Sequence, residues 1–154
     1  MAMTRHDVIF DITYSYHLEK MFGTITGRID RGITLVIIAV GLSAFTPLFS
    51  KAWFAAIIGL LSVAQIVYQF ARQSGVSDDL ARKYLNLSTD AGLLSDEELR
   101  ARFKSLQDND SNVWSVLKNA AYKRACCVLG LPDSTRPLTK REKTFAFLAG
   151  DITD

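Results

Sequence analysis

The sequence lacks the short motifs that carry the chemistry of common enzymes. It contains no glycine-rich phosphate loop, no nucleophile elbow and no HExxH pair of histidines. Its two cysteines, Cys126 and Cys127, are adjacent, which gives neither the CxxC spacing of a zinc site nor an unstrained disulfide between them. We predict that they are small packed side chains, with a reactive or lipidated pair as the alternative. We therefore expect a protein that is not an enzyme and holds no cofactor and no metal.

The chain also lacks an excess of charge of either sign. It has 18 Lys and Arg against 16 Asp and Glu, which gives a net charge of +2. A balance of this kind does not indicate nucleic acid as a partner. Asp7 and Asp11 lie four residues apart with His6 and His17 in the same region. Such groups can bind a metal or move protons, but the spacing fits no tight metal motif, and a solvated helix face is the simpler interpretation.

Charged residues are missing altogether from two long stretches of the chain. Residues 33–50 and 52–71 contain no Asp, Glu, Lys, Arg or His, and Lys51 stands alone between them. At about 1.5 Å of rise per residue, each stretch spans roughly the 30 Å hydrocarbon core of a bilayer. A soluble core helix of this length normally keeps a polar stripe. Residues 33–71 therefore predict a transmembrane helical hairpin, with a buried hairpin of a soluble all-α domain as the alternative.

The positions of Lys and Arg around these stretches predict the orientation of the hairpin. Basic residues are more numerous on the two flanks than in the connecting turn, which holds only Lys51; the flanking ones are Lys20, Arg28, Arg31, Arg72, Arg82 and Lys83. Since positive charge stays on the cytoplasmic side, both termini are expected in the cytoplasm. A cleaved signal peptide does not fit, because about thirty residues of mixed charge precede the first stretch.

The rest of the chain predicts helices, so the fold class is all-α. Residues 1–32 form an N-terminal cytoplasmic helix with roughly helical apolar spacing. Residues 72–132 are expected to form a cytoplasmic antiparallel helical hairpin, with a break or kink at 73–75 and a helix start at Ser77. An apolar stripe at steps of three and four follows, made of Leu80, Tyr84, Leu87, Ala91 and Leu94.

Capping patterns mark the later helices. Ser95 with Glu98, and Thr139 with Glu142, have the spacing of capping boxes. Ser111 or Asn112 is expected to cap a return helix over 113–129, which Gly130 stops. The tail, 133–154, then carries a short amphipathic helix. It lies on the inner leaflet or packs against the helical arms of its own or a neighbouring subunit.

The predicted spans carry two features that suggest association or conduction. Small residues recur at four-residue spacing, Ala55 with Gly59 among them, and such spacing lets membrane helices approach closely. Chance recurrence of common residues explains it equally well. Ser62, Gln65 and Gln69 form a polar row on the second span. For Ser62 and Gln65 the choice is between packing against another helix and lining a pore, whereas Gln69 lies close to the interface.

The layout over about 10–130 resembles the SLATT family of two-transmembrane domains from bacterial conflict systems. The resemblance rests on YQFARQSGVSDDLARKYLNL after the second span and NVWSVLKNAAYKRACCVLG on the return helix. It implies a pore-forming effector of the bacterial inner membrane that perturbs the bilayer and is coupled to a cytoplasmic sensor protein. It implies no catalytic residue.

Three functions follow as hypotheses. The first is a homo-oligomeric effector that permeabilises or depolarises the membrane when triggered, in defence against phage or in another conflict. The second is a non-conducting anchor whose cytoplasmic helices recruit a partner. The third is a phage holin or exclusion protein, which shares the same physics.

Overall fold

The computed structural model describes residues 4–43 and 51–151. Over these residues the regular secondary structure consists of helices, joined by turns and loops. The elements are α1 (Arg5–Ser43), α2 (Lys51–Tyr68), α3 (Phe70–Asp90), α4 (Asp96–Gln107), the short 3-10 helix η1 (Ser115–Leu117), α5 (Lys118–Leu129) and α6 (Lys140–Leu148). The predicted all-α fold class is confirmed.

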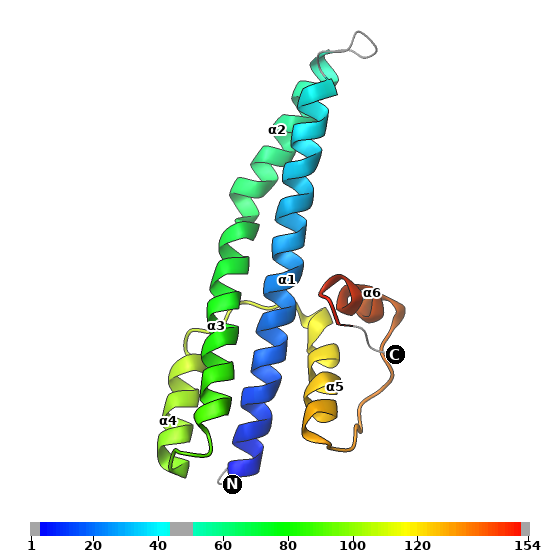
Figure 1. The fold of residues 1–154 in the computed structure, drawn as a ribbon. Coiled ribbons are helices and arrows are strands. Elements are labelled where there is room, and N and C mark those ends of the chain that lie inside the picture. The colour runs from blue at the N-terminus through cyan, green and yellow to red at the C-terminus, as the bar shows by residue number, and fades with distance from the viewer. Residues whose placement is uncertain (1–3, 44–50, 152–154) are drawn as a thin grey trace.

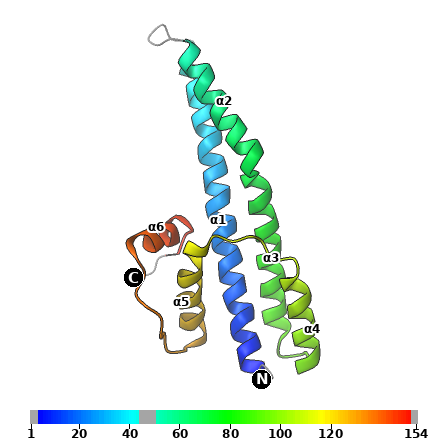
Figure 2. The same ribbon diagram turned by 180° about the vertical axis from the view of Figure 1, so that it is seen from behind.

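The long helix α1 is the axis of the molecule (Figure 1). Helices α2 and α3 return beside it in the opposite direction, and α4 folds back against α3. Helices α5 and α6 pack against α1 on its other side, near the lower half of the rod (Figures 1 and 2). The end of α1 and all of α2 therefore project alone from the helical body.

Helix α1 has no boundary between the predicted N-terminal helix, 1–32, and the predicted first span. It runs unbroken for 39 residues and passes through Gly23, Gly27 and Gly32. Each helical glycine costs up to about 1 kcal/mol relative to alanine. Packing of α1 against α3, α5 and α2 offsets that cost, since tertiary contacts supply most of the stability of helices in proteins.

The helix breaks inside the second apolar stretch, at Gln69, where the backbone is left-handed with φ 47° and ψ 45°. The predicted break at 73–75 and the predicted helix start at Ser77 are wrong, because α3 begins at Phe70 and runs through all of them. Ser77 lies within α3, away from its ends, and its side chain is fully buried. Residues 74 and 75 are weak helix formers, but contact of α3 with α1 keeps this segment helical.

Two hydrophobic clusters hold the body together. In the first, Met21, Phe22 and Ile25 of α1 meet η1, α5 and α6. In the second, Val8 and Ile12 of α1 meet α3 and α4. The predicted stripe on α3 belongs to this buried face: Leu80, Tyr84, Leu87 and Ala91 are buried, and Leu94 is half-buried. The stripe is confirmed as a core-facing surface.

The antiparallel pair within 72–132 is α3 with α4, joined by a short turn over 91–95. The predicted return helix over 113–129 starts later, as η1 and then α5, and its main partner is α1. The predicted cap at Ser111 or Asn112 is wrong, since Trp114 precedes η1 and Leu117 precedes α5. An apolar helix face predicts burial, but it does not say which helix will cover it.

Both predicted capping boxes are confirmed, at Ser95 with Glu98 and at Thr139 with Glu142. Gly130 ends α5 in the left-handed conformation, with φ 65°. The tail helix α6 packs within its own chain, against η1, α5 and α1. Its Ala146 is fully buried, which supports the packed alternative for this segment.

Candidate functional site

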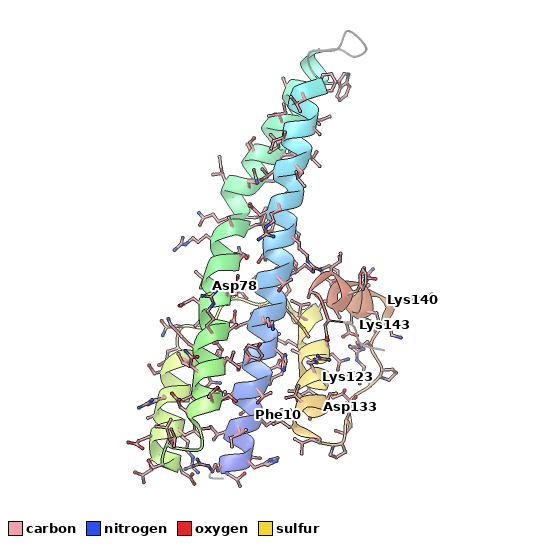
Figure 3. All side chains as sticks on the ribbon, viewed as in Figure 1. Phe10, Asp78, Lys123, Asp133, Lys140 and Lys143 are labelled. Carbon is pink, nitrogen blue, oxygen red and sulfur yellow. The ribbon has the colours of Figure 1, made fainter. Side chains whose placement is uncertain are left out.

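The projecting parts of α1 and α2 expose many large apolar side chains. Leu60 and Ile66 of α2 are each 72% exposed. The same is true of other large apolar residues on both helices: Leu35, Val36, Ile38, Leu42, Trp53, Ile57, Val63 and Val67. Figure 3 shows side chains standing away from both ribbons in the upper half of the molecule. A surface of this kind marks contact with a membrane or with another protein.

One helical segment of the described chain, Ala52–Asp90, is long and apolar enough to cross a membrane, and none of its apolar part is buried. The predicted first span is described only over 33–43, where it forms the end of α1. Its remainder, 44–50, lies outside the described residues. Two antiparallel membrane spans therefore remain a prediction. The described parts of α1 and α2 run in opposite directions, as that prediction requires.

The three residues of the polar row predicted on the second span differ in their burial and in their contacts. Gln65 is half-buried and donates from Nε2 to Thr34 Oγ1 at 3.0 Å and to Asp30 Oδ1 at 3.3 Å, both on α1. Gln69 is exposed at the helix break, and its Oε1 accepts from Arg72 Nη1 at 3.1 Å. Ser62 is half-buried on α2. For Gln65, these contacts support helix packing over pore lining.

Ala55 and Gly59, two small residues of the second span, are not buried against any of the described residues. Ala55 and Gly59 are exposed, and a methyl group at Gly59 would meet nothing within 4 Å. Their outward face is therefore open to a neighbour of another chain.

The small residues that do mediate a close helix approach lie lower, at Gly23 and Gly27. A methyl group would lie 2.7 Å from Asp78 Oδ1 at Gly23, and 2.8 Å from Ser74 Oγ at Gly27. Ser74 Oγ donates to the carbonyl oxygen of Gly23 at 2.8 Å, and Asp78 stands on α3 beside α1 (Figure 3). Their four-residue spacing is visible in the sequence, which does not show the helix that approaches them.

A buried polar cluster ties α1, α3 and the segment before η1 together, and sequence reasoning missed it. Glu19 is 2% exposed. Its Oε1 accepts from the backbone N–H of Ser111 at 3.0 Å, whereas its Oε2 has no hydrogen-bond partner in the described part of the chain. The hydroxyls of Ser77 and Ser111 are hydrogen-bonded at 2.9 Å, and Tyr84 donates its hydroxyl to Asp110.

Burial governs the charge state of this cluster. It raises the pKa of the Glu19 carboxyl; the nearby hydroxyls of Ser77 and Ser111 and the N–H of Ser111 oppose the shift, and the charge of Asp110 adds to it. Burial also raises the pKa of Asp110, against the hydrogen bond from Tyr84. The one signal in the sequence was the position of Glu19, next to the apolar residues 21 and 22 of a core-facing helix.

The acidic and histidine residues near the N-terminus form no metal centre. Within 4–43 and 51–151, no three His, Cys, Asp or Glu side chains come together in a way that could hold an ion. His6, Asp7 and Asp11 line an open pocket of about 370 Å³. Burial lowers the pKa of His17 to about 4, with help from the charges of Arg124 and Lys20, so this ring is neutral at pH 7.

The two cysteines are separate in character. Cys126 is buried against the core, Cys127 is exposed, and both are free thiols. Burial of Cys126 fits the predicted packing role, whereas the exposed Cys127 does not.

Comparison of the chain with protein-family models, with curated proteins and with solved structures finds no match in any of the three. The resemblance to the SLATT family thus stays a prediction that rests on layout and residue pattern.

Proposed function

We propose that this protein is a non-enzymatic effector of the bacterial inner membrane that oligomerises and permeabilises or depolarises the bilayer when triggered. Residues 33–50 and 52–71 would span the membrane, with both termini and the helical body in the cytoplasm. The observation that carries the proposal is the projecting hairpin, whose large apolar side chains are exposed on both helices. Each such side chain gains roughly 1.5–3 kcal/mol on leaving water, so a lipid environment is strongly favoured.

The outward face of α2 supports association between copies. Ala55 and Gly59 are exposed and lie on one side of the helix, with open space beside them. In lipid, small residues at this spacing let two helices gain dispersion contacts. A homo-oligomer assembled through this face would bring several α2 helices together.

The hydrogen bonds of Gln65 support a closed resting state. The side-chain amide of Gln65 donates hydrogen bonds to Thr34 and Asp30 of its own chain. It therefore faces α1 and not a water-filled path. Opening requires α2 to shift against α1 and to expose these polar groups to the oligomer axis. A trigger, such as a cytoplasmic sensor protein, acts by binding one of these two arrangements more tightly than the other.

A dye-release assay in liposomes, together with membrane potential in expressing cells, tests this function. We expect leakage that Gly59→Leu reduces at least tenfold, because the added side chain blocks close approach of neighbouring α2 helices. Ile57→Phe is the matched control, since it adds volume to an exposed position whose neighbours at four-residue spacing, Trp53 and Leu61, are large. Unchanged potential at high expression, with and without the product of the adjacent gene, counts against an effector.

A second candidate function is a non-conducting membrane anchor, and the satisfied hydrogen bonds of Gln65 favour it. The substitution Gln65→Leu distinguishes the effector from the anchor. A pore predicts that leakage changes, whereas an anchor predicts no leakage from either protein. A test of partner recruitment must avoid Leu80, Tyr84 and Leu87, because these residues are buried and charged substitutions there would unfold the body. Leu93→Asp is suitable, since Leu93 is 89% exposed on the turn after α3.

A third candidate, a phage holin or exclusion protein, shares this architecture and these assays. It differs in genetic setting. The identity of the neighbouring genes separates it from a host defence effector.

A further inference from the structure

An open pocket of about 810 Å³ lies where α2 passes into α3. One wall is formed by the junction itself, from Val67 to Val76, and the other by residues 111–118 ahead of and at the start of α5. The segment that leads into η1 crosses α1 just below this junction (Figure 2). The pocket is thus framed by the end of the proposed span and by the cytoplasmic body.

The charge of this pocket is of one sign. Its thirteen lining residues include Arg72 and Lys118 and no carboxylate. Both cations are exposed, and within 4–43 and 51–151 neither forms an ion pair; Arg72 Nη1 is held by Gln69 Oε1 at 3.1 Å. Two unpaired cations beside amide and hydroxyl groups are the usual ligands of a phosphate group.

The pocket also has an apolar side that a free phosphate ion would not use. Val67 and Tyr68, the last residues of α2, line it and are 67% and 58% exposed. They continue directly into the apolar surface of the hairpin. Trp114 stands on the opposite wall, and Trp and Tyr are the residues that favour the level of lipid headgroups.

We propose that this pocket binds the headgroup of an anionic phospholipid of the inner leaflet. Arg72 and Lys118 bind the phosphate oxygens, and Val67 and Tyr68 contact the glycerol and upper acyl chain. Basic pockets on the cytoplasmic side of spans bind anionic headgroups in this manner. The inference rests on the proposed membrane insertion of the hairpin. A bound lipid would hold segment 111–118 against the α2–α3 junction and so join the body to the spans.

The test titrates phosphatidylglycerol or phosphatidylcholine into the full-length protein in a neutral detergent. Trp114 is the reporter, in a Trp53→Phe background that removes the other tryptophan of the chain. We expect a saturable change in Trp114 emission with phosphatidylglycerol and none with phosphatidylcholine. The double substitution Arg72→Gln and Lys118→Gln should weaken apparent binding at least tenfold, because charge-assisted hydrogen bonds are lost.

The matched control is Arg82→Gln with Lys104→Gln, which removes the same charge from exposed positions on α3 and α4 and should bind like the parent. Equal responses to both lipids, or undiminished binding by the Arg72 and Lys118 double variant, would overturn the proposal. So would an equal response to inorganic phosphate at the same concentration, since the ligand would then be a soluble phosphate. If the double variant does not fold, the single substitutions Arg72→Gln and Lys118→Gln carry the same test.

A separate measurement distinguishes failure of this inference from failure of the proposed function. Carbonate-resistant association with vesicles of pure phosphatidylcholine reports insertion alone. Parent protein that inserts into these vesicles but does not distinguish the two lipids retains the membrane function and lacks the lipid site. If the parent protein does not insert at all, both the proposed membrane function and the proposed lipid site are contradicted.

Discussion

Glu19→Gln is expected to stabilise the protein at neutral and alkaline pH. Glu19 is 2% exposed, and its Oε2 has no hydrogen-bond partner among the described residues. Glutamine keeps an oxygen to accept from the N–H of Ser111 and removes the charge that burial penalises and that Asp110 repels. A neutral amide of the same shape costs less to bury than an ionised carboxylate, because the desolvation penalty is larger for charged groups. We therefore expect the free energy of unfolding to rise by about 1–2 kcal/mol at pH 8.

The effect should depend on pH with a definite sign. Because the folded protein raises the pKa of Glu19, it binds this proton more tightly than the unfolded chain does. The stability that proton binding contributes is complete below the ordinary value of 4.5 and is lost as the pH rises through the raised value. Glutamine resembles the protonated carboxyl, so variant and parent should have nearly equal stability at pH 4 and diverge towards pH 8.

The measurement is thermal unfolding of the full-length protein in neutral detergent, followed by helical circular dichroism at both pH values. For a chain of this size, 1 kcal/mol corresponds to about 2–4 °C in the unfolding midpoint. Glu97→Gln is the control, since Glu97 is exposed in the first turn of α4 and should change stability by about 0.5 kcal/mol or less. A loss of stability for Glu19→Gln that is equal at pH 4 and pH 8 would refute the reasoning.

Three further substitutions test the packing of the body by the same unfolding measurement. Gly27→Leu should lower the free energy of unfolding by about 1–3 kcal/mol, because its Cβ would lie 2.8 Å from Ser74 Oγ and force α1 away from α3. Gly32→Leu is the control and should not destabilise the protein, since a Cβ at Gly32 would have no atom within 4 Å. Phe103→Ala should cost about 3–5 kcal/mol, as this ring is 5% exposed in the second cluster. Thr139→Ala should cost about 1 kcal/mol through loss of the α6 cap, and an unchanged midpoint would contradict that role.

Local structure is predictable where a residue acts on its own neighbours in the chain. Both capping boxes and the stop at Gly130 depend on backbone groups within a few residues, so the sequence contains all their parts. The stripe on α3 was also predictable, since the spacing of Leu80 and Tyr84 is that of one helix face. Breaks were harder to predict, and the one at Gln69 has no glycine or proline to mark it.

Contacts between distant segments could not be predicted in this way. The row of Ser62, Gln65 and Gln69 was visible, but the partners of Gln65 on α1 were not, because they lie more than thirty residues away. Glu19 was likewise unremarkable in the sequence, and only the approach of segment 110–111 makes it a buried carboxyl.

The sequence by itself determined that this chain is helical, that one stretch is apolar enough to cross a membrane, and that capping boxes lie at Ser95 and Thr139. Periodicity, charge-free length and capping chemistry are local properties, so they need no fold to express them. Only the tertiary structure decided that α1 is one continuous rod, that α5 packs on α1 rather than on α3, and that Arg72 and Lys118 share a pocket. These depend on which apolar faces meet, and many helix faces of similar composition compete for each partner.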